Sequence, residues 1–200
     1  MKLPASLLPL LLTACVLAAC DPVTVTVAGA GGAVGMGAAE ERGFEGAVDD
    51  TKIRAAINGQ WIDHDVALFR EVTLTVTEGR VMLTGSVAKQ DTRIEAVRLT
   101  WQVAGVRQVI DEIQVTDESG FVSAVQDSWI ANKLRTQLMF DGKVKNINYT
   151  VDVVNGVVYL MGIAQSQDEM DRVIDKARNL SDVKKVVNHI VLKTDPRRNS

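Results

Sequence analysis

The spacing of apolar side chains between residues 47 and 194 changes repeatedly from a helical period to a strand period and back. Apolar residues three or four positions apart are typical of one helix face, and apolar residues at every second position are typical of a half-buried strand. In order along the first half, the apolar positions are Ile53 and Ile57, then Val72, Leu74, Val76, Val81 and Leu83, then Ile94, Val97 and Trp101, then Val109, Ile113 and Val115. This order predicts a helix, a hairpin, a second helix and a last strand.

The second half shows the same order with clearer signals. Its apolar positions are Ile130, Leu134 and Leu138, then Tyr149, Val151, Val153, Val158 and Leu160, then Met170, Val173, Ile174 and Ala177, then Val186, Ile190 and Leu192. Asn155 and Gly156 stand between the two alternating runs, and Asn-Gly favours the type I′ turn that joins two antiparallel strands. We therefore expect one αββαβ unit in each half.

The two halves are also similar residue by residue, as expected for an internal repeat. The matching segments are 78–85 with 155–162, 106–110 with 183–187, and 52–57 with 133–138. The first two pairs are 77 positions apart, and the third pair is 81 positions apart. We attribute the difference to a longer first loop, residues 58–70, in the first copy. Trp61 would then lie in this loop and cap the first domain.

Together these features predict an α+β protein with two tandem domains, residues 47–117 and 124–194. Each domain is expected to have two helices packed on one face of a three-stranded mixed sheet. A glycine closes the second strand of each hairpin, at Gly85 and Gly162. We expect both glycines to serve close backbone packing, so that a bulky charged residue at either would destabilise its domain. Trp101 ends an apolar helix face and is predicted to be buried.

The start of the chain resembles a bacterial lipoprotein signal. The apolar run 7–17 has the length of a signal-peptide core and is short for a membrane span, and the Leu-Ala-Ala-Cys that ends at Cys20 resembles the lipobox. We expect residues 1–19 to be removed and Cys20 to be diacylated on its sulfur and then N-acylated. A weaker match ends at Cys15, and an uncleaved anchor or an ordinary secretory signal is a further alternative. Cleavage before Cys20 leaves no other cysteine, which excludes disulfides, thiol catalysis and cysteine-ligated zinc in the mature chain.

Acylation would hold the mature chain on a membrane, because several acyl chains anchor stably where a single chain is marginal. Residues 20–46 consist largely of Gly, Ala and Val and predict a flexible tether behind the acylated cysteine. Asp21 resembles the signal that retains lipoproteins of enteric bacteria at the inner membrane, whereas Val16 would follow the cysteine if Cys15 were used. We expect the protein to face the periplasm from the outer membrane, with the inner membrane as the alternative.

Charge is divided unevenly between the two halves. The whole chain has a net charge of −3, which argues against a nucleic-acid binder. Residues 45–118 contain thirteen acidic and eight basic residues, whereas residues 125–195 contain nine acidic and ten basic residues. The basic tail, residues 195–200, adds Arg197 and Arg198. Attraction to an anionic membrane surface is worth about 1 kcal/mol per nearby basic residue, and only the second half could gain from it.

The first helix of the second half carries basic and large apolar side chains outside its core stripe. They are Trp129, Lys133 and Phe140 on one side, and Arg135 and Met139 on the other. A Trp side chain suits the headgroup boundary of a bilayer, and Lys and Arg stems can lie among apolar groups while their charges reach phosphates. The hypothesis is that these five residues bind phospholipid. The sequence equally allows Trp129 to be a partly buried staple at the helix start with the charges solvated.

Catalysis and metal binding have little support in the sequence. The cluster at Asp63, His64 and Asp65 lacks a third distant His or Cys ligand. His189 stands where the first half has Glu112, which suggests an exposed side chain. The chain has neither a Gly-x-Ser-x-Gly nucleophile motif nor a distinctive pair of carboxylates. We therefore predict no enzymatic activity, no cofactor, no metal site and no small-molecule substrate.

Several motifs resemble the BON domain family. They are the αββαβ order, the glycine that closes each second strand, the Gly105-Val106 entry to the last strand (Asp182-Val183 in the second copy), and the helix start Asp127-Ser128-Trp129-Ile130. The resemblance covers roughly residues 48–193 and is closest between residues 127 and 164. Two such domains behind a lipobox resemble the tandem-BON lipoproteins of bacterial envelopes.

The resemblance implies binding of anionic phospholipid through the first helix of the second domain. It also implies a role in outer-membrane integrity and proximity to the outer-membrane β-barrel assembly machinery. Val48 and Asp49 stand roughly where the second copy has Trp129 and Ile130, so no lipid role is expected for the first domain. The alternative is a protein-interaction scaffold for an envelope assembly or secretion complex, in which sheet edges and the acidic first domain carry specificity.

Overall fold

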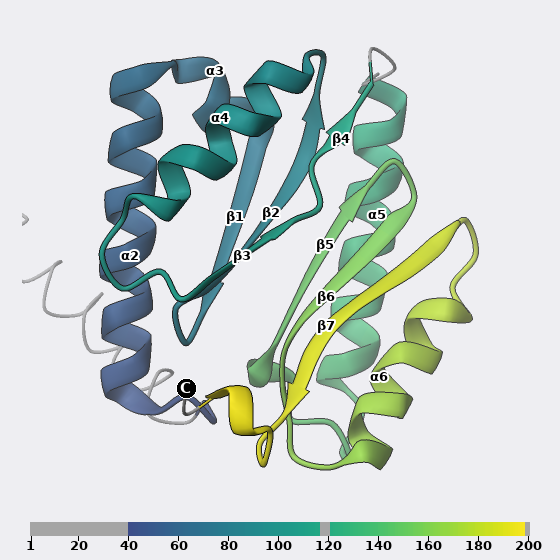
Figure 1. The fold of residues 1–200 in the computed structure, drawn as a ribbon. Helices are drawn as coiled ribbons and strands as arrows, with labels where there is room; N and C mark the ends of the chain where they lie inside the picture. The colour runs from purple at the N-terminus through teal and green to yellow at the C-terminus, as the bar shows by residue number, and fades with distance from the viewer. Residues whose placement is uncertain (1–39, 117–120, 199–200) are drawn as a thin grey trace, which may run out of the picture. The chain divides into compact units, whose positions relative to one another are not determined.

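The computed structural model describes residues 40–116 and 121–198 (Figure 1). The predicted signal peptide, Cys15, Cys20 and most of the predicted tether lie outside these residues. Within the described ranges, no helix combines the length and the apolar character needed to cross a bilayer.

The described residues form two copies of one unit. The first copy has α2 (Gly43–His64), α3 (Val66–Glu71), β1 (Val72–Thr77), β2 (Arg80–Val87), α4 (Gln90–Trp101), β3 (Gln108–Asp111) and β4 (Gln114–Val115). The second has α5 (Phe121–Met139), the 3-10 turn η1 (Asn146–Asn148), β5 (Tyr149–Val154), β6 (Val157–Ala164), α6 (Gln167–Arg178) and β7 (Lys185–Leu192), followed by the 3-10 turn η2 (Pro196–Arg198). Helix α2 begins four residues before the expected domain start at residue 47.

Each copy has a mixed sheet with its hairpin beside a parallel last strand, which confirms the α+β fold. The strand orders are β1-β2-β3 and β5-β6-β7; the first pair in each sheet is antiparallel and the second is parallel. The last strand of the first copy is interrupted, because β3 and β4 both pair with β2 but are separated by residues 112–113. At the break, the side chain of Asp111 accepts a hydrogen bond of 3.2 Å from the backbone N–H of Ile113.

The predicted long loop 58–70 is wrong, because this segment is helical. Helix α2 continues to His64, and Asp65 then caps α3 by accepting a hydrogen bond of 2.8 Å from the backbone N–H of Ala67. Trp61 is 0% exposed and lies in the core of the first copy beside Ile57 rather than capping it. An Asp followed by a short apolar run is a helix-start signal. The segment was taken for a loop because its apolar residues do not alternate as those of a hairpin do.

The offset of 81 inferred for the first helices is also wrong by one helical turn. Asp50 of α2 accepts hydrogen bonds from the backbone N–H groups of Glu78 and Gly79 in the β1–β2 turn. Asp127 of α5 accepts the equivalent bonds from Asn155 and Gly156. These anchors are 77 positions apart, like the rest of the repeat, so Lys52 is the residue equivalent to Trp129.

Trp101 was predicted to be buried, but 51% of its surface is exposed. Helix α4 turns Ala96, Leu99 and Thr100 toward the core, and Ile94 is exposed with Trp101 on the opposite side. The equivalent helix α6 buries Val173 and Ala177, 77 positions after Ala96 and Thr100, as predicted. The helix of the first copy was misassigned because Ala96 and Thr100, which give no strong apolar signal, form its buried face together with Leu99.

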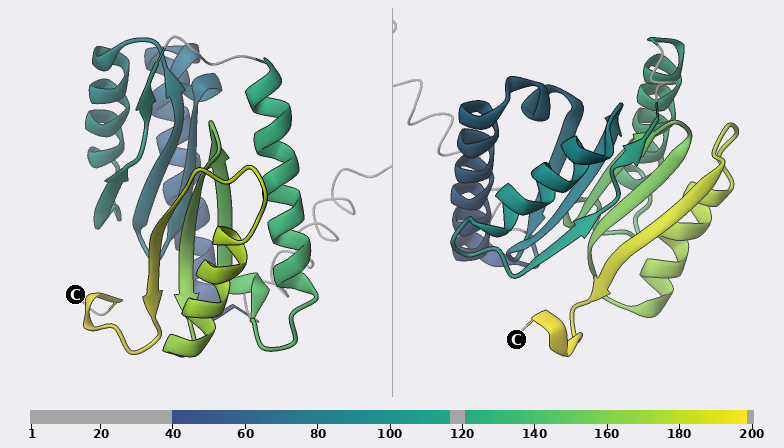
Figure 2. Two further views of the ribbon diagram at one scale, coloured as in Figure 1. Left: turned by 90° about the vertical axis from the view of Figure 1, so that its right-hand side faces the viewer. Right: turned by 45° about the horizontal axis from the view of Figure 1, so that its top comes forward.

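The two sheets contact one another on the faces that their helices leave uncovered. Helices α2 and α4 cover the face of the first sheet that points away from the second copy, and α5 and α6 cover the face of the second sheet that points away from the first copy (Figure 2). Met82 and Ile110 of the first copy form one buried cluster with Tyr159 and Met161 of the second. The two copies within residues 34–200 therefore belong to one compact unit.

Equivalent residues meet at this contact, as at an isologous dimer interface. Thr75 donates a hydrogen bond of 3.1 Å to the carboxylate of Asp152, and the two positions are 77 apart. His189 Nε2 lies 2.8 Å from Glu112 Oε1, again 77 positions away. The expectation of an exposed His189 is therefore wrong, because 23% of its side chain is accessible and it pairs with the first copy.

The basic tail is attached to the first copy. Arg198 forms an ion pair of 2.6 Å with Glu78, and both side chains are largely buried, at 13% and 15% exposure. Arg107 donates hydrogen bonds to the backbone carbonyls of Arg197 and Arg198. Arg198 therefore does not add a solvated positive charge to the second copy, as the count of basic residues had suggested.

Candidate lipid-binding surface

Helix α5 is fixed to the second sheet at its start and along one face. The carboxylate of Asp127 holds the β5–β6 turn through two backbone hydrogen bonds, of 2.6 Å to Asn155 and 2.7 Å to Gly156. Asn155 and Gly156 have φ of 52° and 79°, as the predicted type I′ turn requires. Ile130, Ala131, Leu134 and Leu138 are buried in the core of the second copy, so the opposite face of the helix points away from the core.

The side chains opposite the core form a row that we call the outer stripe of α5. It consists of Val125, Trp129 and Lys133 of the helix and of Phe140, which directly follows it; Lys133 is half-buried and the other three are exposed. Val125 is 56% exposed, Trp129 51% and Phe140 79%. The spacings of four, four and seven residues place these positions on one face of a helix. Val125 was missed in the sequence analysis, although its distance of four residues from Trp129 could have identified it.

Lys133 and Trp129 form a cation–π pair within this stripe. The ammonium Nζ of Lys133 lies 4.4 Å from the centroid of the Trp129 ring. Such a pair at an exposed site is worth about 0.5–1 kcal/mol. The contact holds the indole at the surface with a positive charge above it, which is the combination that an anionic headgroup layer would meet.

Arg135 and Met139, which the sequence analysis grouped with these residues, lie on another side of α5. The guanidinium of Arg135 donates to the backbone carbonyl of Val151 in the edge strand β5, and also to Asn132 Oδ1 at 3.5 Å. Arg135 and Met139 line a pocket beside β5 together with Tyr149. The structure thus separates the five predicted residues into three on the outer stripe and two toward β5.

The acidic residue next to Phe140 is neutralised by its neighbours. Asp141 accepts a backbone hydrogen bond from Lys143 and lies 3.0 Å from Lys176 Nζ and 3.6 Å from Arg172. The backbone bond first, and the Lys176 hydrogen bond second, lower the pKa of the Asp141 carboxyl. Because this carboxylate is paired, it offers less repulsion to an anionic surface near Phe140, and the side chain of Lys143 is exposed beside it.

The equivalent surface of the first copy keeps the valine of the outer stripe, because Val125 corresponds to Val48 at the offset of 77. It lacks the other three side chains, since Trp129 corresponds to Lys52, Lys133 to Ala56 and Phe140 to Asp63. The aromatic side chains of the stripe are therefore present in the second copy alone, among the residues that the structure describes.

Gly85 and Gly162 occupy the same place in the two sheets. A Cβ on Gly162 would lie 2.1 Å from the carbonyl oxygen of Asn148, and a Cβ on Gly85 would lie 2.3 Å from that of Glu71. Their φ angles are 153° and 129°. The β5 and β1 strands thus approach β6 and β2 more closely than a side chain would permit.

We predicted no metal site at the cluster of Asp63, His64 and Asp65. In the structure, His64 and Asp65 make local contacts. His64 Nε2 lies 3.2 Å from Glu95 Oε1, and Asp65 caps α3. In residues 40–116 and 121–198, no group of three or more potential ligands is close enough to hold a metal ion.

Comparison with known proteins gives a family and several relatives. The BON domain matches residues 49–117 and 126–194. The chain is 39% identical over 147 residues to an "Uncharacterized protein in gshII 5'region" of Anaplasma centrale, covering 73% of this chain and 96% of the relative. It is 30% identical over 160 residues to the outer membrane lipoprotein DolP of Haemophilus influenzae, covering 78% and 82%. It is 29% identical over 148 residues to osmotically-inducible protein Y of Escherichia coli, covering 73% and 74%. The family match spans more than half of the chain, and the chain therefore belongs to the BON domain family as a protein with two tandem BON domains.

Proposed function

We propose that this chain is a non-enzymatic envelope lipoprotein that docks on anionic phospholipid through the outer stripe of α5. The observation that carries the proposal is the exposed Trp129 with the ammonium of Lys133 4.4 Å above its ring. An indole at the headgroup boundary keeps its N–H wet while its rings leave water, and an ammonium beside it can reach a phosphate.

Docking would be peripheral and shallow. The exposed surfaces of Val125, Trp129 and Phe140 would enter the headgroup region, and Lys133 would move from the indole face to lipid phosphates. Each basic residue near the surface adds about 1 kcal/mol. Binding of the isolated fragment is therefore expected to be weak, and acylation at Cys20 would strengthen it by holding α5 near the bilayer.

The predicted lipobox and the names of the relatives support the proposed location in the envelope. One relative is named an outer membrane lipoprotein. We propose that this chain is likewise attached at Cys20, faces the periplasm from the outer membrane and supports the integrity of that membrane. Proximity to the outer-membrane β-barrel assembly machinery is part of the same proposal and rests on the family resemblance.

The test is sedimentation of residues 34–200, the compact unit, with vesicles of graded anionic content. The variant Trp129→Glu places a carboxylate in the stripe, and Trp101→Glu is its matched control. Trp101 is the same residue type with the same 51% exposure, but it lies on α4 of the first copy. Unfolding midpoints of both variants would establish that they are folded.

We expect binding by the unmodified fragment to rise with anionic lipid and to decrease with salt. Trp129→Glu should abolish binding, whereas Trp101→Glu should leave it unchanged. If a folded Trp129→Glu variant sediments like the unmodified fragment, the outer stripe is not the lipid contact. Absence of binding at every composition would leave the acyl group as the membrane contact and would favour the protein-interaction scaffold.

A further inference from the structure

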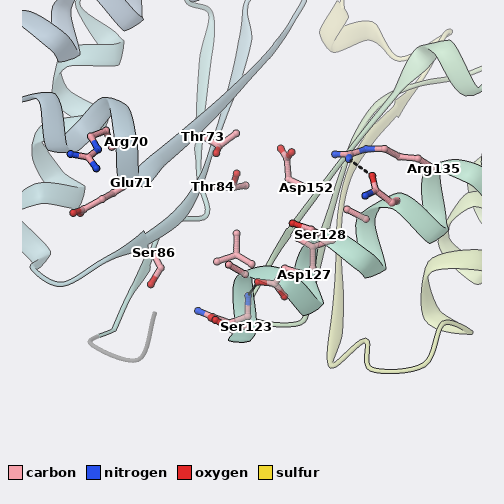
Figure 3. Close-up of a pocket in the computed structure, with 16 residues that line it drawn as sticks. Arg70, Glu71, Thr73, Thr84, Ser86, Ser123, Asp127, Ser128, Arg135 and Asp152 are labelled. Atoms are coloured by element: carbon pink, nitrogen blue, oxygen red, sulfur yellow. Dashed lines mark hydrogen bonds between the residues drawn. The ribbon is translucent and has the colours of Figure 1, made fainter. Parts of the chain in front are cut away.

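Two pockets lie where the two copies meet, and the repeat relates them to one another. The larger has a volume of about 650 Å³ and lies between β1–β2 and helix α5 (Figure 3). The smaller has a volume of about 90 Å³. Apart from residues 40–42, every described residue that lines the smaller pocket has its equivalent, 77 positions away, in the larger one. Asn148 and Thr150, for example, correspond to Glu71 and Thr73.

The smaller pocket is filled by a segment of the chain itself, residues 40–42, and we call it the filled pocket. Arg42 donates one hydrogen bond of 2.7 Å to the carboxylate of Asp50 and one of 3.2 Å to the carbonyl of Val76. The backbone N–H of Glu41 donates to Asn148 Oδ1 at 2.9 Å. The filled pocket thus holds a short turn of the chain in which Glu40 and Glu41 precede the guanidinium of Arg42.

The larger pocket, which we call the open pocket, presents matching acceptors without the matching cation. Asp127 is equivalent to Asp50, and both carboxylates hold the same two amides of a hairpin turn. Asp50 has the ion pair with Arg42, whereas Asp127 has no ion-pair partner among the described residues. At the offset of 77, the sequence has Ser119 where the first copy has Arg42, and position 119 lies outside the residues that the structure describes.

The open pocket also contains polar groups that the fold does not use. Thr84 is 1% exposed and lines the pocket, and its hydroxyl has no hydrogen-bond partner among the described residues. The hydroxyl of Ser86 is likewise buried and unpaired there. Leaving a buried hydroxyl without a partner costs about 1–3 kcal/mol, which a bound polar group would recover. The positions of the second copy that are equivalent to Thr84 and Ser86 have the apolar residues Met161 and Ile163.

Figure 3 shows how these groups face one another. Thr73, Thr84 and Ser86 extend from the first copy toward Asp127 and Ser128 on α5, with Asp152 between the two sides. Arg135 lies at the rim and donates to Asn132 and to the carbonyl of Val151. Three carboxylates (Glu71, Asp127 and Asp152) and two guanidinium groups (Arg70 and Arg135) line the open pocket, so acidic groups exceed basic ones by one. This excess of negative charge and the unpaired hydroxyls suit a short peptide that carries a positive charge.

We propose that the open pocket binds a short peptide segment of a partner protein through an arginine side chain. The guanidinium donates to the carboxylate of Asp127 and to the carbonyl of Val153, as Arg42 does to Asp50 and Val76. Polar groups of the segment pair with Thr84 and Ser86. This site lies on a different side of α5 from the outer stripe, so peptide binding and lipid docking are independent.

The probe is a capped heptapeptide with the sequence of residues 40–46, whose first three residues line the filled pocket in the chain. Binding to residues 34–200 is followed by chemical shifts of backbone amides. The blocking variant is Ala124→Trp, because Ala124 is exposed on α5 and lines the open pocket. Its control is Gln126→Trp, because Gln126 is exposed on the same helix and does not line the pocket.

We expect saturable shifts at Thr84, Ser128 and Asn155 below about 1 mM peptide. Replacing the peptide arginine with glutamine should weaken binding at least about tenfold, because a hydrogen-bonded ion pair is lost. Ala124→Trp should prevent binding, and Gln126→Trp should not. Shifts centred on Asn148 and Gln165 would mean that the peptide exchanges with residues 40–42, and would overturn the proposal.

Two further outcomes would also contradict it. Equal affinity for the arginine and glutamine peptides would exclude a guanidinium site. Concentration-dependent dimerisation of the fragment that Arg42→Gln abolishes would assign the open pocket to residues 40–42 of a second copy instead of a partner protein.

Discussion

Replacing Gly162 with alanine should strongly destabilise the second domain. The new Cβ would lie 2.1 Å from the carbonyl oxygen of Asn148 and 3.0 Å from the Cα of Tyr149, both of which belong to backbone and cannot rotate away. Gly162 also has a φ of 153°, a backbone angle that residues with a side chain rarely adopt. Backbone strain of this kind costs about 1–3 kcal/mol, and overpacking costs a further 1–3 kcal/mol or so. We therefore expect a loss of about 2–6 kcal/mol, a large part of the stability of a small domain.

The matched control is Gly59→Ala in helix α2. Gly59 is exposed, and a Cβ there would meet nothing within 4 Å. Alanine in a helix interior should stabilise by about 1 kcal/mol relative to glycine. Urea unfolding of residues 34–200, followed by far-UV circular dichroism, gives both free energies. If Gly162→Ala and Gly59→Ala unfold at the same urea concentration, the close approach of β5 and β6 is not a constraint on stability.

Two further predictions concern the core and the contact between the copies. Trp61→Ala should cost about 3–5 kcal/mol because the indole is fully buried, whereas Trp101→Ala should cost less than about 1 kcal/mol, and equal urea midpoints would contradict this assignment. Burial raises the pKa of Asp152, against the opposing hydrogen bond from Thr75 and the charges of Arg135 and Arg54. A folded pKa above the unfolded value of about 3.9 means that ionised Asp152 destabilises the fold increasingly as the pH rises through the folded pKa. Asp152→Asn should therefore stabilise at pH 7 and have little effect below about pH 4, and an equal effect at both pH values would refute it.

The sequence predicted the hairpins and the repeat correctly because a strand has a period of two. A slip of one residue in β1 or β5 would turn every apolar side chain to the other face, so alternation and the Asn155-Gly156 turn determine the register. A helix is less informative. A shift of four residues keeps the same face toward the core, which is why Lys52 was matched with Lys133 instead of with Trp129.

Burial of individual aromatic residues was harder to predict than the elements. Trp61 and Trp101 were assigned by their apparent place in a loop and on an apolar face, and both assignments were wrong. The core of α4 uses Ala96 and Thr100, whose small side chains give no strong apolar signal. In a helix that packs closely on a sheet, small residues can mark the buried face better than large ones.

The candidate site could be predicted only in part. Helical spacing placed Trp129 and Lys133 on one side of α5, and the two side chains are in contact in the structure. Helical spacing could not show that Arg135 donates a hydrogen bond to the edge strand β5, because this contact depends on the position of β5 relative to α5 in the folded protein. The pattern of apolar residues could not predict the contact between the two sheets either, because in each copy alone one face of the sheet has no predicted partner.

The most direct test of lipid docking is quenching of Trp129 fluorescence by brominated anionic phospholipid. Trp101→Phe in residues 34–200 leaves Trp129 on the outer stripe and Trp61 in the core as the remaining indoles. Trp129→Phe added to this variant leaves Trp61 alone and gives the background. The account predicts quenching in the first variant, its reversal by salt, and none in the second. Emission that brominated vesicles leave unchanged, under conditions where the fragment sediments with them, would show that another surface contacts the membrane.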